Sequence, residues 1–167
     1  MIRNTLFYLF LIITSTVFAQ ENTEQEQINK DVWFNFMQAY QDLDASLFNQ
    51  IHTDDVIRTV VDGNRMYLGK EYKDKNLEVF NNWNAKRVDQ KIEFSFISRV
   101  QKEGYAYEIG IYKLTRMNGT RSNSYYGKFN VILRKEYGIW RIMSDSDTNE
   151  KSTIGEEDFI NGENLTY

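Results

Sequence analysis

Apolar residues in the first third of the chain recur at helical spacing. Between residues 28 and 43 they stand three or four positions apart, at Ile28, Val32, Trp33, Phe36, Met37, Tyr40 and Leu43. This period predicts an amphipathic helix. Asp44 then predicts the N-cap of a second, short helix, because its carboxylate can accept a hydrogen bond from a free backbone N–H. A third helix is expected from about Gly69 to Trp83, with its apolar residues on one face.

After Trp83 the hydrophobic period changes to two, which is typical of strands. Four such runs follow, KIEFSFISRV, YAYEIGIYKLTRM, SYYGKFNVILRKE and GIWRIMSDS, and turn dipeptides separate them. An earlier run, DVIRTVV, is followed by an Asp62-Gly63 turn and a short second strand. Successive strands joined by tight turns predict an antiparallel meander. Helices that precede such a sheet predict an α+β fold.

The N-terminal residues are typical of an export signal. Arg3 precedes the apolar run TLFYLFLIITSTVF, and Val17 and Ala19 are the small residues of a signal-peptidase site. An uncleaved membrane anchor is the alternative, although the run is short for a membrane span. Cleavage near Ala19 predicts a periplasmic or extracellular protein with no membrane contact after processing.

The remaining chain has the length of one domain. The polar residues 20–25 are expected to form a disordered linker, residues 26–149 the folded domain, and residues 150–167 a polar C-terminal tail. Phe159 and Ile160 are expected to pack that tail back onto the domain.

Composition excludes several classes of function. The chain has no Cys and one His, so we expect no disulfide and no zinc or iron site. Its net charge is −4, with no long basic run, which argues against nucleic acid as a partner. No cofactor is predicted. Aromatic residues make up 15 % of the chain, which is enough to build a core or to line a cavity.

Five segments together resemble a known superfamily. In order along the chain they are LFxxIHTDDV, YLGKE, YAYEIGIY, YGKFNVILRK and GIWRIMSD. Their order and spacing over residues 26–149 resemble the SnoaL-like, nuclear-transport-factor-2-like superfamily, and especially its exported bacterial domains of unknown function. The resemblance implies a cone-shaped, curved antiparallel sheet wrapped around N-terminal helices. It also implies a pocket at the open end and, in many relatives, a homodimer formed through the sheet.

The superfamily includes a ketosteroid isomerase that uses a Tyr, an Asp base and a protonated Asp. Alignment places Phe36, Val60 and Asn130 at those three positions, so the resemblance does not extend to isomerase chemistry. A shift of the alignment by two residues would place Asp62 at the base position. Because this fold hosts many activities, it does not by itself assign one.

The candidate catalytic residues are His52, Asp55 and Asp145. His52 is a candidate general base oriented by Asp55, since imidazole titrates near neutral pH. A histidine at a helix end, bound to a backbone carbonyl, is the structural alternative. Asp54 and Asp55 are a candidate carboxylate pair, or else turn residues before the first strand.

The candidate ligand-binding residues are polar or aromatic groups on elements expected to bound the pocket. They are Tyr40, Arg58, Trp83, Glu108, Tyr112, Tyr126, Asn130 and Asp145. Strand alternation places Glu108 and Tyr112 on one face. Arg58 is a candidate partner for Glu108 or for an anionic ligand. Alternation does not reveal which face is concave.

An acidic stretch near the C-terminus has part of a calcium-loop spacing. Asp145, Asp147, Asn149 and Glu156 stand at positions one, three, five and twelve. Glu150 occupies the position that requires Gly, and a strand precedes the loop where an EF-hand has a helix. We therefore predict no metal site and interpret Asp145 as the end of the last strand, near the pocket rim.

These observations favour a pocket domain that binds a small, fairly apolar molecule without strong catalysis. A hydrolase or lyase of the same fold and a sheet-mediated dimerisation module are the alternatives.

Overall fold

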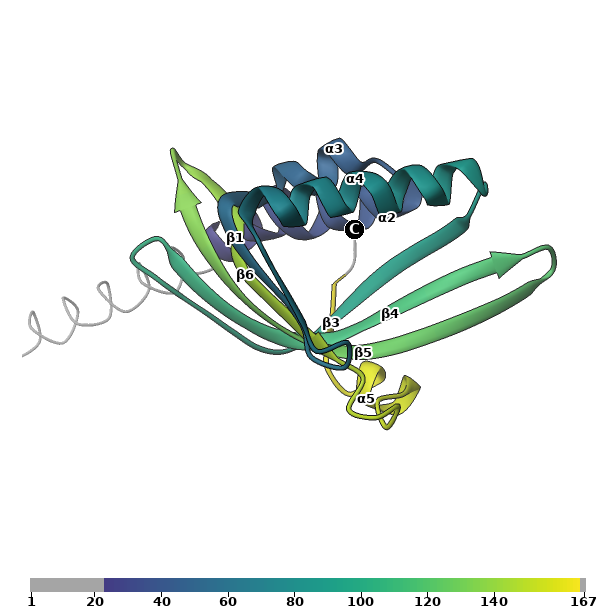
Figure 1. The fold of residues 1–167 in the computed structure, drawn as a ribbon. Coiled ribbons are helices and arrows are strands. Elements are labelled where there is room, and N and C mark those ends of the chain that lie inside the picture. The colour runs from purple at the N-terminus through teal and green to yellow at the C-terminus, as the bar shows by residue number, and fades with distance from the viewer. Residues whose placement is uncertain (1–22, 166–167) are drawn as a thin grey trace, which may run out of the picture.

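In the computed structural model, which describes residues 23–165, helices lie across one face of a strongly curved sheet (Figure 1). The helical elements are η1 (Asn29–Trp33), a π-helical turn, α2 (Phe34–Asp42), α3 (Ala45–Gln50), α4 (Gly69–Ala85) and α5 (Glu156–Ile160). The strands are β1 (His52–Val60), β2 (Arg65–Leu68), β3 (Asp89–Lys102), β4 (Tyr105–Asn118), β5 (Arg121–Glu136), β6 (Ile139–Thr148) and β7 (Glu163–Asn164). The α+β, cone-shaped architecture predicted from the sequence is thereby confirmed.

Local signals in the sequence set the boundaries of the helices. Asp44 caps α3, because its carboxylate accepts a hydrogen bond of 2.9 Å from the backbone N–H of Leu47. Leu43 ends α2 in a left-handed conformation with φ of 56°, which lets the chain turn sharply into α3. The third predicted helix corresponds to α4 and extends two residues beyond Trp83.

The sheet has seven strands in the order β2-β1-β6-β5-β4-β3-β7. The predicted meander of β3, β4, β5 and β6 is antiparallel throughout. β1 lies parallel to β6, a pairing between distant segments that turn signals do not predict. β1 begins at His52, so Asp54 and Asp55 belong to the strand and the turn expected before it does not form.

The core fills the space between α2, α3, α4 and the concave face of the sheet. Trp33, Trp140, Phe80, Ile28 and Leu133 are among its most deeply buried side chains. Burial of so much aromatic and aliphatic surface is the main favourable contribution to folding. Among residues 23–165, no helix is both long and apolar enough to cross a membrane.

Two terminal segments are more ordered than their composition predicts. Residues 23–28 are helical, and Glu24 pairs with Lys135 at 2.9 Å, so the expected disordered linker is wrong for residues 23–25. The predicted signal peptide and the rest of the linker lie outside the described residues.

The predicted C-terminal tail forms α5 and β7. α5 lies on the side of the sheet away from the other helices (Figure 1), and β7 pairs with β3 as the last strand of the sheet. Phe159 is buried, as expected, whereas Ile160 is exposed. The polar residues around Phe159 remain at the surface, so Phe159 is the buried side chain of α5, while the pairing of β7 with β3 and the packing of Leu165 against the core also hold the segment.

Candidate functional site

A cavity of about 120 Å³ lies between the helices and the concave face of the sheet. Its wall is mainly aromatic and aliphatic, formed by Trp33, Phe36, Tyr40, Phe48, Tyr72, Ile92, Phe94, Tyr112, Leu114, Phe129 and Val131. Three charged side chains join this wall, Arg58 from β1 and Asp145 and Asp147 from β6. An apolar cavity with a few converging polar groups is the usual form of a small-molecule site.

The charged residues meet because of strand register. In the parallel pairing of β1 with β6, Arg58 lies opposite Asp145. Side chains alternate between the two faces of a strand, so Asp145 and Asp147 both point to the concave face. Ser146, between them, points to the outer face, where its Oγ donates to the carbonyl of Asn130 at 3.2 Å.

Arg58 bridges the two carboxylates. Its Nη1 lies 3.3 Å from Asp145 Oδ1 and its Nη2 lies 2.6 Å from Asp147 Oδ1. The three side chains are only 11–20 % exposed. Tyr112 Oη donates a long hydrogen bond of 3.4 Å to the second oxygen of Asp147. A buried arginine held by two carboxylates has little freedom to move, so the polar end of the cavity is preorganised.

Burial shifts the ionisation of this cluster. It raises the pKa of Asp145 and of Asp147 above the ordinary aspartate value, although Arg58 acts in the opposite direction. The pKa of Arg58 is raised: burial disfavours its charge, but the neighbouring carboxylates favour it more strongly. Burial raises the pKa of Tyr40 to about 12 and raises the pKa of Tyr112 as well, so both phenols are hydrogen-bond donors at neutral pH.

Four of the predicted ligand-binding residues line this cavity together, and they are Tyr40, Arg58, Tyr112 and Asp145. Asp147 and Tyr72 also line the cavity, but they were not among the predicted ligand-binding residues. The alternation in SDSD was the available signal for Asp147, since two aspartates two residues apart on a strand share a face.

Glu108 takes part in a separate buried cluster. It points to the concave face, but it accepts hydrogen bonds from Trp33 Nε1 at 2.6 Å, Arg99 Nε at 3.0 Å and Gln25 Nε2 at 2.8 Å. Its cationic partner is therefore Arg99 and not Arg58. The register of β3 and β4 places Arg99 directly opposite Glu108, and the cluster fixes the N-terminal helical segment to the sheet.

The other three predicted residues do not line the cavity. Tyr126 is on the outer face, where its hydroxyl donates to Glu156. Asn130 is also on that face and donates to Tyr107 Oη at 2.9 Å. Trp83 packs against Tyr40, with ring centroids 5.7 Å apart, without reaching the cavity. Odd-numbered and even-numbered residues of β5 face opposite sides, so Tyr126 and Asn130 point away from the helices.

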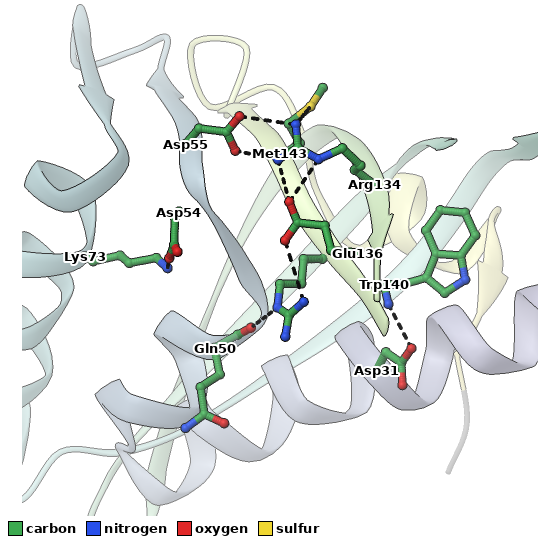
Figure 2. Close-up of polar contacts among 10 residues, drawn as sticks. Asp31, Gln50, Asp54, Asp55, Lys73, Arg134, Glu136, Trp140 and Met143 are labelled. Atoms are coloured by element: carbon green, nitrogen blue, oxygen red, sulfur yellow. Dashed lines mark hydrogen bonds and ion pairs between the residues drawn. The ribbon is translucent and has the colours of Figure 1, made fainter. Parts of the chain in front are cut away.

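The acidic residues at the start of β1 form surface ion pairs. Figure 2 shows Asp55 directed at Arg134 and Asp54 directed at Lys73, at 2.8 and 2.7 Å. The two carboxylates therefore face different cations and do not form an acid–base pair. Both lie outside the cavity lining, and hydrogen bonding to Arg134 lowers the pKa of Asp55.

His52 is buried, and Asp55 does not orient it. Its Nδ1 lies 2.8 Å from the backbone carbonyl oxygen of Phe48, so Nδ1 carries the proton and donates. Among residues 23–165, Nε2 has no hydrogen-bond partner. Burial lowers the pKa of His52 to about 3, and the ring is therefore neutral at physiological pH. This is the structural alternative considered above, a histidine bound at a helix end.

The acidic side chains of the C-terminal stretch, which has part of a calcium-loop spacing, do not converge on one point. Asp145 and Asp147 face Arg58, whereas Glu156 pairs with Lys113 on the outer face at 2.7 Å. Within residues 23–165, no group of three or more His, Cys, Asp or Glu side chains is placed to hold a metal ion.

Comparison with known proteins identifies the fold. No protein-family model matches the sequence, and no curated protein is significantly similar to it. Solved structures do match. A nuclear-transport-factor-2-like protein of unknown function from Shewanella oneidensis has a TM-score of 0.62 at 14 % identity, covering 74 % of this chain and 98 % of that one.

Two further structures agree. A nuclear-transport-factor-2-like protein with a cystatin-like fold from Novosphingobium aromaticivorans has a TM-score of 0.65 at 11 % identity, covering 79 % of this chain and 85 % of that one. A ketosteroid isomerase-like protein from Erwinia carotovora has a TM-score of 0.52 at 19 % identity, covering 68 % and 87 %. The chain therefore has the nuclear-transport-factor-2-like fold, as the sequence motifs predict.

Proposed function

We propose that this protein, which has the nuclear-transport-factor-2-like fold, is an exported pocket protein that binds a small, largely apolar molecule and has no strong catalytic activity. The observation that carries the proposal is the aromatic cavity whose polar end consists of Arg58, Asp145 and Asp147. Export rests on the N-terminal sequence, and mass spectrometry of the processed protein tests it by locating the cleavage site near Ala19.

The size of the cavity indicates the size of the ligand. A dry cavity of about 150 Å³ binds benzene in another protein. The cavity described here is of similar volume, about 120 Å³, and the side chain of Asp147 keeps 20 % exposure at its polar end. A single ring with a short polar arm fits such a site.

Binding of benzyl alcohol, a neutral single-ring probe, tests the proposal. Saturation-transfer NMR should detect binding, and the indole N–H signal of Trp33, which lines the cavity, should shift. Leu114→Phe places a larger side chain in the cavity and should abolish both signals. Met117→Phe is the matched control, because Met117 is on the same strand, is exposed and lies outside the lining. Equal binding by wild type and Leu114→Phe would refute the proposal.

An acid–base enzyme is the second candidate, favoured by the raised pKa of both carboxylates in the cavity. A protonated aspartate can donate a proton while its ionised neighbour accepts one, and Arg58 can stabilise developing negative charge. A panel of hydrolase and lyase substrates should then reveal a turnover that Asp145→Asn removes. If the wild type is as inactive as the variant, this candidate fails.

A homodimer is a compatible proposal. On the outer face, β1 and β2 expose Ile57, Met66 and Leu68, each more than 40 % accessible. Their partners in the strand register, Thr59 and Ser144, add no charge to this surface. A second copy of the same face is its simplest complement.

A further inference from the structure

The cavity contains one more negative charge than positive charge. Among the described residues that line it, the charged groups are Arg58, Asp145 and Asp147. When both carboxylates are ionised, the sum is −1. The tyrosines from α2, α4 and β4 are neutral at physiological pH because burial raises the pKa of each. Arg116, a cation outside the lining, lies over Trp83 and donates to Gln90.

Both carboxylates keep free acceptor capacity. Each uses one oxygen for Arg58. Arg58 contacts Asp145 at Oδ1, 3.3 Å away, and Asp145 is only 8 % exposed. Asp147 Oδ2 accepts a long bond of 3.4 Å from Tyr112. A carboxylate can accept about four hydrogen bonds, so the cavity offers unused acceptors next to an aromatic wall.

We propose that the cavity binds a small aromatic amine, whose ammonium group lies against Asp147 and Asp145 and whose ring contacts the aromatic wall. This rests on the proposed function, because it assigns a ligand class to the same cavity. The ammonium supplies the missing positive charge and up to three donors for the free oxygens. Aromatic rings attract cations, and Tyr40 and Tyr112 line the same cavity.

The same geometry disfavours ligands whose polar group is anionic or neutral. A carboxylate ligand would meet two aspartates, while Arg58 is already bound to both. A neutral alcohol can fill the cavity and donate one hydrogen bond, but it leaves the surplus charge uncompensated. Uncompensated buried charge is costly, so the charge of the head group should determine affinity.

Three probes that differ only in their head group test the proposal. Benzylamine, benzyl alcohol and benzoate share a ring and one further carbon. We expect benzylamine to bind the purified protein at pH 7.5 at least tenfold more tightly than benzyl alcohol, and benzoate to bind most weakly. Asp147→Asn should reduce benzylamine affinity about tenfold and change benzyl alcohol affinity less than twofold. Asp54→Asn, which makes the same change of charge at the surface, should leave both affinities unchanged.

A pH series on the wild-type protein provides a measurement that needs no variant. Benzylamine affinity should fall as the pH is lowered through the titration of the cavity carboxylates, while benzyl alcohol affinity should not. If benzylamine binds no more tightly than benzyl alcohol, the amine proposal is wrong and the pocket proposal stands. If none of the three probes binds, both proposals are wrong.

Discussion

Replacement of Arg58 by methionine tests whether the charged end of the cavity behaves as a buried ion triad. Met is similar in length to the aliphatic part of Arg, so the substitution mainly removes the guanidinium. It deletes the contacts of 3.3 and 2.6 Å to Asp145 and Asp147, together with a 3.3 Å hydrogen bond to the carbonyl of Thr59. Two carboxylates then face a largely apolar cavity without a cation.

The burial of the triad indicates the size of the effect. Removal of one partner from a buried ion pair costs about 3–5 kcal/mol. The carboxylates here keep 11 and 20 % side-chain exposure, so water screens them in part and the lower end, ~3 kcal/mol, applies. For a domain of this size that corresponds to a fall in Tm of about 6–12 °C. Because total stability is typically about 5–15 kcal/mol, the variant should still fold.

The effect should depend on pH in a defined direction. Burial raises the pKa of Asp145 and Asp147 in the folded state, so the folded state holds their protons more tightly than the unfolded state does. Such groups favour folding below the unfolded pKa, about 3.9, and this contribution is lost as the pH rises through the folded pKa. Without Arg58 the folded pKa values rise further. The stability deficit of Arg58→Met should therefore be largest at pH 7 and smallest below about pH 4.

Urea unfolding of wild type and Arg58→Met at several pH values measures this difference. The triple variant Arg58→Met, Asp145→Asn, Asp147→Asn is the control, because its cavity carries no charge, and it should recover most of the loss at pH 7. A deficit below about 1 kcal/mol at pH 7 would falsify the argument, since it would show that the carboxylates do not depend on Arg58. A deficit independent of pH would contradict it equally.

Three further predictions concern Asp147, the C-terminal segment and the proposed dimer. Asp147→Asn should raise the free energy of unfolding at pH 7 by about 1 kcal/mol, because it removes the surplus buried charge; denaturant titration checks this, and a loss of stability contradicts it. Phe159→Ala should release α5 and β7, because Phe159 packs against Tyr126. Amide exchange should quicken at residues 156–165 with little change elsewhere, and unchanged exchange there rejects the anchoring role. Met66→Lys should convert the proposed dimer to a monomer in sedimentation analysis, whereas Leu77→Lys, on the exposed side of α4, should not.

Much of the fold was predictable from local signals. The helical period ending at Leu43, the N-cap at Asp44 and the Gly-containing turns predict elements that the structure contains. The turn signals also predict the antiparallel order of β3 to β6, because strands joined by tight turns become neighbours. Part of the candidate site followed as well, since Tyr40, Arg58, Tyr112 and Asp145 line one cavity.

The remaining features depend on contacts between distant segments. The sequence by itself determined the residue types, the alternation along each strand and the α+β class. It did not determine which face of the sheet is concave, because alternation divides a strand into two faces without saying which one the helices cover. In the structure the helices cover the face that carries Glu108, whereas Tyr126 lies on the opposite, outer face. The parallel pairing of β1 with β6, which brings Arg58 to Asp145 across 87 positions, was decided only by the tertiary structure, because no turn connects those two strands.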